Sequence, residues 1–305
     1  MKRKTAIAGA AFGLGAVMLF ASGYSAMADT SGYDVYKTAA KNLKTQTSLT
    51  VHAEWSVSDN GKPLVTGTAD AKVNKDDQTG SMKATVGDGS LSKTVQAFRQ
   101  DGKVIVQTGD SDVYRVLEQG DSRWQRQGAH AGPPAAAEPV LDALMGHVRE
   151  LATVENAADG SKQAALHLEG RQVPALVNAI GSMLVAHASG EGAGWHGKMA
   201  SDDPAGLPWG GQPMDLSAAL PKLKDKIKVE TVALDAGISP ADVLTSQKAE
   251  IHVTGNDEEG KPHELVLRVA ADFSDLSTTT PDRVDLTGKQ TVEISKDDRK
   301  WGWKH

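Results

Sequence analysis

A two-residue alternation of apolar and polar side chains, beginning at Leu49, is the feature that most constrains the fold of this chain. In the first such segment the apolar positions are Leu49, Val51, Ala53, Trp55 and Val57. The residues between them are polar, and the segment runs into the turn-forming pair Asn60-Gly61. Because successive side chains of a strand point to opposite faces of a sheet, this pattern predicts a half-buried strand that enters a β-hairpin.

The same alternation recurs along most of the chain. It predicts further strands at 65–73, 82–86, 91–98, 103–107, 113–117, 162–169, 227–234, 248–254, 263–273 and 291–294. Turn signals such as Asp101-Gly102 separate consecutive segments. The sequence therefore predicts about ten or eleven short antiparallel strands.

Many of the positions predicted to face inward are small. They include Gly67, Ala69, Ala71, Ala84 and Ala97, and only 5% of all residues are aromatic. A sheet with small inward residues fills the space above it poorly, whereas protein interiors are close-packed. We therefore expect helices, a ligand or both to occupy that face.

Apolar residues recur at helical spacing in four segments of the chain. Ser31 is expected to cap a helix from about Gly32 to Lys44. Glu138 and Pro139 begin the second predicted helix, which runs to Leu151, and Pro174 opens the third, which runs to His187. A short fourth helix is predicted at 216–226. The apolar stripes of the second and third helices contain Val140, Leu144, Val148, Val177, Ile180 and Leu184. The mixture of strands and helices places the chain in the α+β class.

The first 28 residues have the pattern of a signal peptide. Three basic residues precede an apolar stretch, and Ala26 and Ala28 suit a signal peptidase, so cleavage is predicted after Ala28. The alternative is that this segment is retained as a membrane anchor. Both interpretations place the remaining chain outside the cytoplasm, as one domain over 29–295 with a flexible tail at 296–305.

Composition excludes several classes of protein. The chain has no cysteine, which excludes a disulfide framework and a lipid-attachment cysteine. Its net charge is −6, and loss of the basic leader would make the mature chain more acidic. This acidic balance argues against nucleic acid or anionic lipid headgroups as the main partner. The mature protein is predicted not to span a membrane.

A Gly- and Pro-rich segment at 188–215 is long for a connection within a compact domain. It contains Trp195, Met199, Trp209 and Met214. One interpretation is a lid over an apolar groove, with the tryptophans covering the ligand. The other is a disordered surface loop whose tryptophans pack locally.

Motifs for catalysis are missing from the sequence. It contains neither a G-x-S-x-G nucleophile elbow nor an H-E-x-x-H zinc motif. His187, His196 and the two methionines of the long segment are of types that suit copper(I), but their spacing matches no recognised ligand set. We predict no enzyme activity, no metal and no cofactor.

The order of elements and several short phrases resemble the LolA-like half-barrel superfamily of envelope lipoprotein and lipid carriers. The phrases are Tyr36-Lys37-Thr38-Ala39, Ser48-Leu49-Thr50, Asp59-Asn60-Gly61-Lys62, Asp101-Gly102-Lys103, Ser111-Asp112-Val113-Tyr114, Thr279-Thr280-Pro281 and Asp285-Leu286-Thr287-Gly288-Lys289. They look like those of secreted members found in spore-forming Gram-positive bacteria. The resemblance implies a curved antiparallel sheet, a half-barrel, wrapped around several α-helices and leaving an apolar groove. It implies no cargo and no catalytic residue.

The resulting hypothesis is a non-enzymatic, secreted or cell-envelope protein that binds a hydrophobic small molecule, a lipid or an acylated protein as a monomer. The groove residues expected are Trp55, Met82, Val140, Leu144, Val148, Val177, Ile180 and Leu184, with Trp195, Met199, Trp209 and Met214 in the lid. The alternative hypothesis is an envelope protein-interaction or stress-sensing module with a filled core.

Overall fold

The computed structural model describes residues 31–109, 111–118, 149–173 and 220–293. The only α-helix within these ranges is α2 (Gly32–Thr45). Two short 3-10 turns, η1 (Arg149–Leu151) and η2 (Gly170–Gln172), accompany it. The strands are β1 (Ser48–Asp59), β2 (Lys62–Asn74), β3 (Thr79–Gly87), β4 (Ser92–Gln100), β5 (Lys103–Thr108), β6 (Val113–Glu118), β7 (Thr153–Asn156), β8 (Lys162–Glu169), β9 (Asp225–Ile238), β10 (Leu244–Asn256), β11 (Pro262–Ser274) and β12 (Gln290–Glu293).

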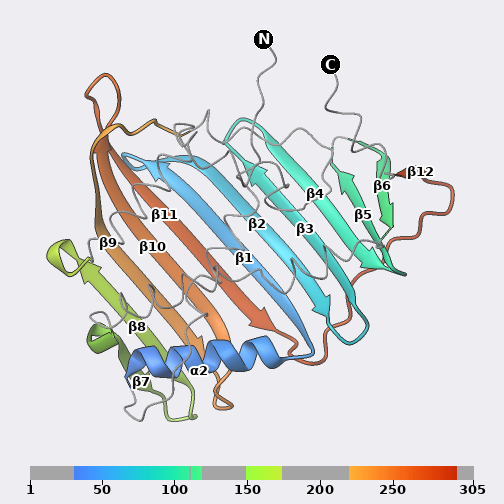
Figure 1. The fold of residues 1–305 in the computed structure, drawn as a ribbon, viewed down its shortest axis with the longest axis horizontal. Coiled ribbons are helices and arrows are strands. Elements are labelled where there is room, and N and C mark those ends of the chain that lie inside the picture. Colours follow the sequence, from blue (N-terminus) through green and yellow to red (C-terminus); the bar gives the residue numbers. More distant parts are fainter. Residues whose placement is uncertain (1–30, 110, 119–148, 174–219, 294–305) are drawn as a thin grey trace.

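All of these strands belong to one open sheet (Figure 1). Its order is β12-β6-β5-β4-β3-β2-β1-β11-β10-β9-β8-β7. Every neighbouring pair is antiparallel except β12 and β6, which run parallel. The pair β1 and β11 joins the early strands to the late ones, with Val51 opposite Phe273 and Trp55 opposite Val269.

The predicted fold class is wrong. The described chain is one large, mostly antiparallel open sheet with a single α-helix, not a sheet wrapped around several helices. The short helix predicted at 216–226 is replaced, where the chain is described, by coil up to Lys224 and then β9. Of the helix predicted from 138 to 151, the described part is the 3-10 turn η1. Residues 138–148 and 174–187 lie outside the described ranges.

The physical reason lies in how the strands pair. Local periodicity indicates which residues form strands, but not how far their hydrogen bonds extend sideways. Here β9, β10 and β11 have 14, 13 and 13 residues, and β1 pairs along its length with both β2 and β11. Backbone groups are therefore paired within one wide sheet, and β7, which the alternation did not predict, forms one edge of it.

The turns and the helix cap follow the predictions from the sequence. Asn60 and Gly61 both have positive φ, of 48° and 77°, as the tight turn between β1 and β2 requires. Ser31 is the N-cap of α2, and its hydroxyl accepts a hydrogen bond from the Asp34 amide at 3.4 Å. The carboxylate of Asp34 in turn accepts a hydrogen bond from Arg149 Nε at 3.2 Å, which ties η1 to the start of the helix.

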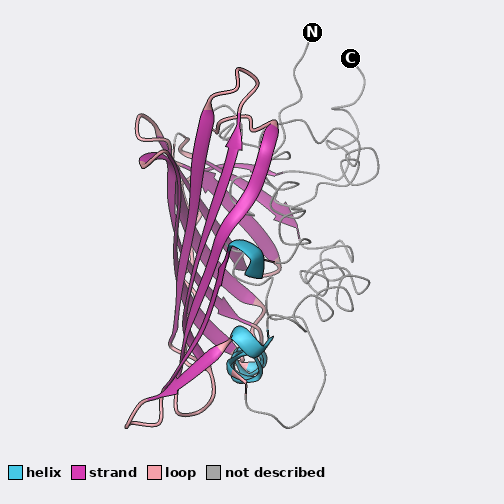
Figure 2. Ribbon diagram, turned by 90° about the vertical axis from the view of Figure 1, so that its left-hand side faces the viewer, coloured by secondary structure: helices cyan, strands magenta, loops and turns pink. Residues whose placement is uncertain are grey.

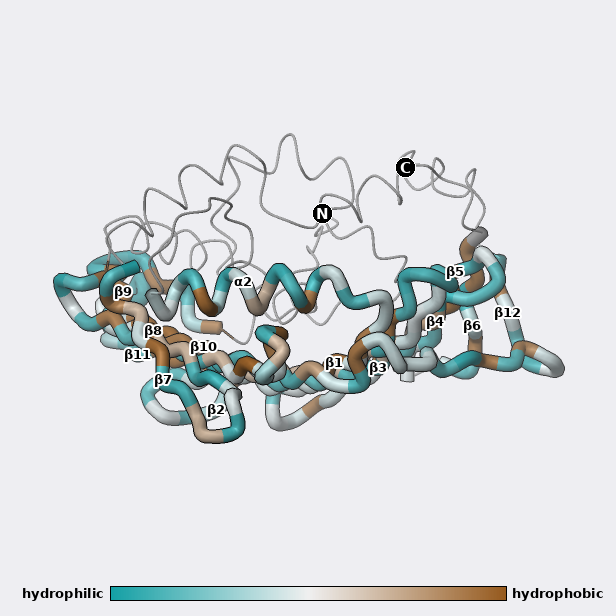
Figure 3. Tube along the Cα trace, turned by 90° about the horizontal axis from the view of Figure 1, so that it is seen from below, coloured by the Kyte–Doolittle hydropathy of each residue, from teal (hydrophilic) through white to brown (hydrophobic). Residues whose placement is uncertain are grey.

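The helix α2 lies against one face of the sheet (Figures 2 and 3). We call this the helix-bearing face. Leu43, which is buried, and the fully buried Ala39 belong to a core cluster that includes Phe273 of β11 and Ile238 of β9. A second core cluster joins β8 to β11 around Leu166, Val232, Val253 and Leu265. No helix in the described ranges is both long and apolar enough to cross a membrane.

The segment 275–289, which we call the strap, crosses the opposite face at the ends of β1 to β5. Its backbone amides donate to side chains on the sheet: Thr279 to Ser48 Oγ at 3.0 Å, Asp282 to Ser81 Oγ at 3.0 Å, and Val284 to Gln100 Oε1 at 2.9 Å. Ser48, Ser81 and Gln100 are buried, and these hydrogen bonds compensate their burial. The strap thereby leads the chain to β12, which lies at the edge of the sheet beside β6.

Candidate functional site

The helix-bearing face carries the apolar half of the alternation. The small residues predicted to face inward lie on it in register across neighbouring strands: Ala53 is opposite both Ala69 and Ala271, and Ala69 is opposite Ala84. Ala53, Ala69 and Ala84 are all buried. Because their side chains project little above the backbone, bulkier groups can approach the centre of the sheet closely.

Trp55 rests on a glycine in this face. Trp55 and Gly67 are directly opposite each other on β1 and β2. A side-chain Cβ built at Gly67 would overlap the ring carbons of Trp55 and lie 2.6 Å from its Nε1. The indole therefore occupies the space that a side chain at position 67 would fill, and the ring itself stays partly exposed. Such an aromatic-glycine pair places a flat apolar surface over the sheet.

Substitution of Gly67 by alanine tests this contact. We expect it to lower the free energy of unfolding by about 1–3 kcal/mol, because the added methyl overpacks against the indole. Gly80, on β3 of the same face, is the matched control, since the nearest atom to its Cβ is 3.5 Å away. Gly80→Ala should be neutral or stabilising by up to about 1 kcal/mol. Chemical denaturation compares the two, and equal effects would contradict the packing described.

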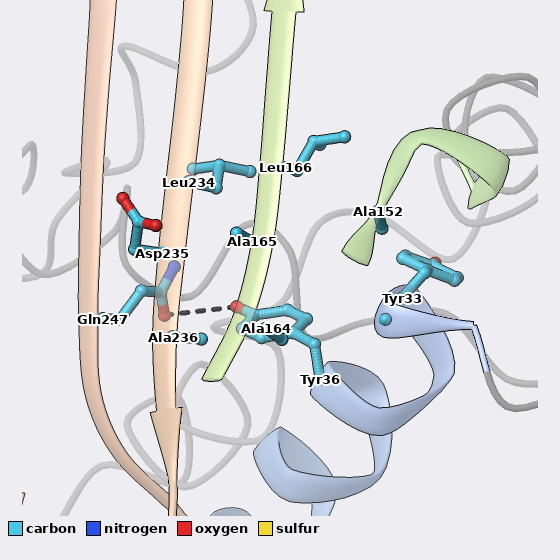
Figure 4. Close-up of a pocket in the computed structure, with 11 residues that line it drawn as sticks. Tyr33, Tyr36, Ala152, Ala164, Ala165, Leu166, Leu234, Asp235, Ala236 and Gln247 are labelled. Carbon is cyan, nitrogen blue, oxygen red and sulfur yellow. Dashed lines mark hydrogen bonds between the residues drawn. The ribbon is translucent and has the colours of Figure 1, made fainter. Parts of the chain in front are cut away.

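An apolar cavity lies between the start of α2 and strands β8 to β10 (Figure 4). Its volume is about 40 Å³, enough for a few water-sized groups but not for a long acyl chain. Side chains of Tyr36, Leu166 and Leu234 are among those that line it. The cavity is therefore too small to hold a long acyl chain by itself.

Tyr36 and Gln247 form the polar contact beside this cavity. The Tyr36 hydroxyl donates to Gln247 Oε1 at 3.2 Å, and Gln247 is buried on β10. Burial raises the pKa of the Tyr36 phenol, partly opposed by the hydrogen bond to Gln247, so the hydroxyl remains protonated at neutral pH. This pair fixes α2 over the sheet and offers no acid or base near neutrality.

Two of the groove residues predicted from the sequence can be placed. Trp55 and Met82 both lie on the helix-bearing face, but Met82 of β3 is in register with Ala71 rather than with Gly67. Met82 lies four positions along β3 from Val86, the residue opposite Gly67, which corresponds to roughly 13 Å along the strand. The structure therefore puts them on one surface without bringing them together.

The other predicted site residues lie outside the described ranges. For the groove these are Val140, Leu144, Val148, Val177, Ile180 and Leu184, and for the lid Trp195, Met199, Trp209 and Met214. His187 and His196, weighed for copper, lie outside as well. Within the described part of the chain, no group of three or more His, Asp or Glu residues is arranged to hold a metal ion.

Sequence reasoning did not single out a buried charged cluster at the hairpin ends. His263 is only 7% exposed, and its Nδ1 lies 2.8 Å from Asp59 Oδ2 while its Nε2 lies 3.1 Å from Asp257 Oδ2. Burial lowers the pKa of His263, but the hydrogen bonds to both carboxylates outweigh it, and the net pKa is raised. No local pattern could have indicated this cluster, because Asp59 and His263 are 204 residues apart.

Comparison with known proteins does not assign this chain to a family. No protein-family profile matches the chain, and no curated protein matches it by sequence. Among solved structures, the ywiB protein from Bacillus subtilis is 8% identical, with 75% of this chain and 93% of that chain covered and a TM-score of 0.15. A hot dog fold protein of unknown function from Alicyclobacillus acidocaldarius is 10% identical, with coverages of 83% and 90% and a TM-score of 0.11.

A third similarity is to the dehydratase domain from the terminal module of the rifamycin polyketide synthase. It is 12% identical, with 80% of each chain covered and a TM-score of 0.13. None of these scores demonstrates a shared fold, so none carries an argument about function. The resemblance to LolA-like carriers stays a prediction that these comparisons do not test.

Proposed function

We propose that this protein is a non-enzymatic, extracytoplasmic binding protein whose helix-bearing face receives the hydrocarbon part of a lipid, another hydrophobic molecule or an acylated partner. The observation that carries the proposal is the partly exposed indole of Trp55 lying over Gly67 beside a row of small apolar residues. Trp55 is partly exposed there, and the buried alanines beside it add little side-chain bulk above the sheet. Burial of a hydrocarbon chain there is favourable by roughly 25 cal/mol for each Å² removed from water.

On β2 and β3 this surface favours an apolar ligand. Gly67, Ala69 and Ala84 carry no side-chain donors or acceptors, whereas Lys93 and Arg99 of β4 and Arg115 of β6 share the face nearer the β12 edge. A separate small apolar cavity lies on the same face beside Tyr36, at the start of α2. A ligand with many hydroxyls or charges would lose its hydration on this surface without replacement hydrogen bonds.

Titration with dansyl-undecanoic acid tests the proposal. We expect saturable binding with blue-shifted dansyl emission, and energy transfer to the dansyl group from tryptophan. The chain has six tryptophans, so Trp55→Phe should reduce the transfer by more than the loss of one average donor in six. Unchanged transfer in Trp55→Phe would place the probe elsewhere, and no saturable binding would contradict the proposal.

Two substitutions to leucine at adjacent residues, one on the proposed binding surface and one on the other face, form a matched pair. Ala84 and Lys83 are adjacent on β3 and point to opposite faces, Ala84 buried and Lys83 exposed. Ala84→Leu should weaken binding of the acyl probe at least tenfold by occupying the shallow surface, whereas Lys83→Leu should leave the affinity unchanged. Far-ultraviolet circular dichroism confirms that both variants are folded before the titrations are compared.

The alternative proposal, a protein-interaction module, makes the opposite prediction for the same titration. A folded protein that fails to take up the probe would favour it. Recognition through a sheet edge is disfavoured, because both described edge strands, β7 and β12, have only four residues. Short edges are a common protection against strand addition.

A further inference from the structure

The face of the sheet opposite α2 contains a hollow of about 740 Å³. It extends across seven neighbouring strands, from β9 through β10, β11, β1, β2 and β3 to β4. Six inter-strand spacings correspond to roughly 29 Å. The volume falls within the range of ligand sites, and the length suits an extended molecule lying across the strands.

The hollow is lined by both small residues and long polar ones. Ala233 and Ala270 are half-buried, whereas Lys248 and Arg268 beside them are exposed. Lys248 is in register with Ala270, and Arg268 is in register with Ser56. The alternation of small and long side chains along neighbouring strands produces the depression.

One end of the hollow, over β1 to β4, is lined by hydroxyl groups. Thr66 and Thr68 of β2 are exposed, Ser56 lies opposite Thr66, and Thr85 lies opposite Thr68. The Thr85 hydroxyl pairs with Thr94 at 3.0 Å. Those of Ser56, Thr66 and Thr68 have no side-chain hydrogen bond within the described part of the chain. Each free hydroxyl can donate one hydrogen bond and accept others.

The other end is charged but nearly balanced. Arg268 Nε donates to Glu250 Oε2 at 2.7 Å, and Lys248 is in register with Asp235. With Glu54, the lining holds three carboxylates and two cations. Hydrogen bonding to His252, followed by the bond to Arg268, lowers the pKa of Glu250, so this carboxylate stays ionised near neutrality. The hollow has no excess charge that would select a strongly ionic ligand.

We propose that this hollow binds a hydroxyl-rich oligosaccharide chain, laid across the strands with its hydroxyls paired to Thr66, Thr68 and Ser56. A protein partner fits less well, because interface hot spots are enriched in large anchors. Trp55 and Val269 belong to the lining of the hollow, but the strand register directs their side chains to the other face. An apolar ligand would leave the hydroxyls without hydrogen-bond partners and would remove water from the Glu250–Arg268 pair. Because binding rests on hydrogen bonds rather than on ring stacking, we expect a Kd of about 0.1–1 mM.

Isothermal titration calorimetry with chitohexaose, cellohexaose and maltohexaose tests the proposal on the full chain. We expect saturable binding of at least one hexasaccharide. The double substitution Thr66→Val and Thr68→Val should weaken it about tenfold, as expected for two lost neutral hydrogen bonds. Valine is isosteric and favours strands, so the fold is retained.

The control is Thr231→Val on β9. Thr231 lies on the same face, opposite His252, and does not line the hollow. Thr231→Val should leave hexasaccharide affinity unchanged. All of these threonine variants should bind the dansyl fatty acid as the parent protein does, because that ligand is proposed to bind on the helix-bearing face. No saturable binding of any hexasaccharide at millimolar concentration would overturn the proposal. Binding that is lost in high salt but unaffected by the valine substitutions would overturn it in favour of an ionic ligand.

Discussion

Replacement of His263 by glutamine is expected to lower the free energy of unfolding by about 3 kcal/mol at pH 6. The reason is that His263, buried and protonated, lies between two carboxylates. Without its charge, Asp59 and Asp257 face each other across the space that the ring occupied. Asp59 Oδ1 already lacks a hydrogen-bond partner in the described structure, so this carboxylate depends on His263 for its compensation.

The effect should depend on pH with a defined sign. The pKa of His263 is raised above the ordinary histidine value of about 6.5 in the folded protein. Its contribution to stability is therefore fully present below about pH 6.5 and is lost as the pH rises through the folded-state pKa. The pKa of Asp257 is lowered, chiefly by the hydrogen bond to His263, so its contribution is lost as the pH falls toward the acid range.

Urea denaturation of the parent protein and of His263→Gln at pH 6 and pH 9 measures this. The difference between them should be largest at pH 6 and shrink at pH 9. His167→Gln is the matched control, because His167 is paired with Glu169 on the surface and its side chain is 60% exposed. It should cost at most about 1 kcal/mol. An equal loss for His263→Gln at both pH values would show that shape, and not charge, is what the cluster contributes.

Substitution of Gly32 by alanine should destabilise the protein by more than 2 kcal/mol, although alanine is the better helix former. Gly32 is the first residue of α2, and it docks directly on the backbone that leads into β7. A Cβ there would overlap the carbonyl oxygen of Thr153 and lie 2.8 Å from the carbonyl carbon of Ala152. Backbone atoms cannot move aside as a flexible side chain can, so the helix must shift.

The sign of the stability change in Gly32→Ala distinguishes helix propensity from overlap with the strand backbone. Helix propensity alone would stabilise Gly32→Ala by up to about 1 kcal/mol. Overlap with the strand backbone predicts the opposite sign and also separates Tyr36 from Gln247. Thr38→Ala, at an exposed position of the same helix, is the control and should be neutral or slightly stabilising. A stabilised Gly32→Ala in thermal denaturation would show that α2 does not dock as described.

Several features of this protein followed from the sequence because their causes are local. The hydroxyl of Ser31 and the spacing behind it identify the start of α2, and Asn60-Gly61 forces a tight turn. The alternation placed Trp55 and Met82 on the same apolar face without further information. In each case the deciding interactions span a few residues, so neighbours in sequence are sufficient to predict them.

What the sequence could not determine depends on residues far apart in the chain. The sheet is joined through β1 and β11, which local patterns do not specify, and the strap reaches Gln100 from Val284. The indole of Trp55 lies over Gly67 because strand pairing places them opposite each other. The hollow on the opposite face exists because seven strands bring its lining residues into register. Periodicity determines which face a side chain takes, but only the complete set of strand pairings determines which side chains meet there.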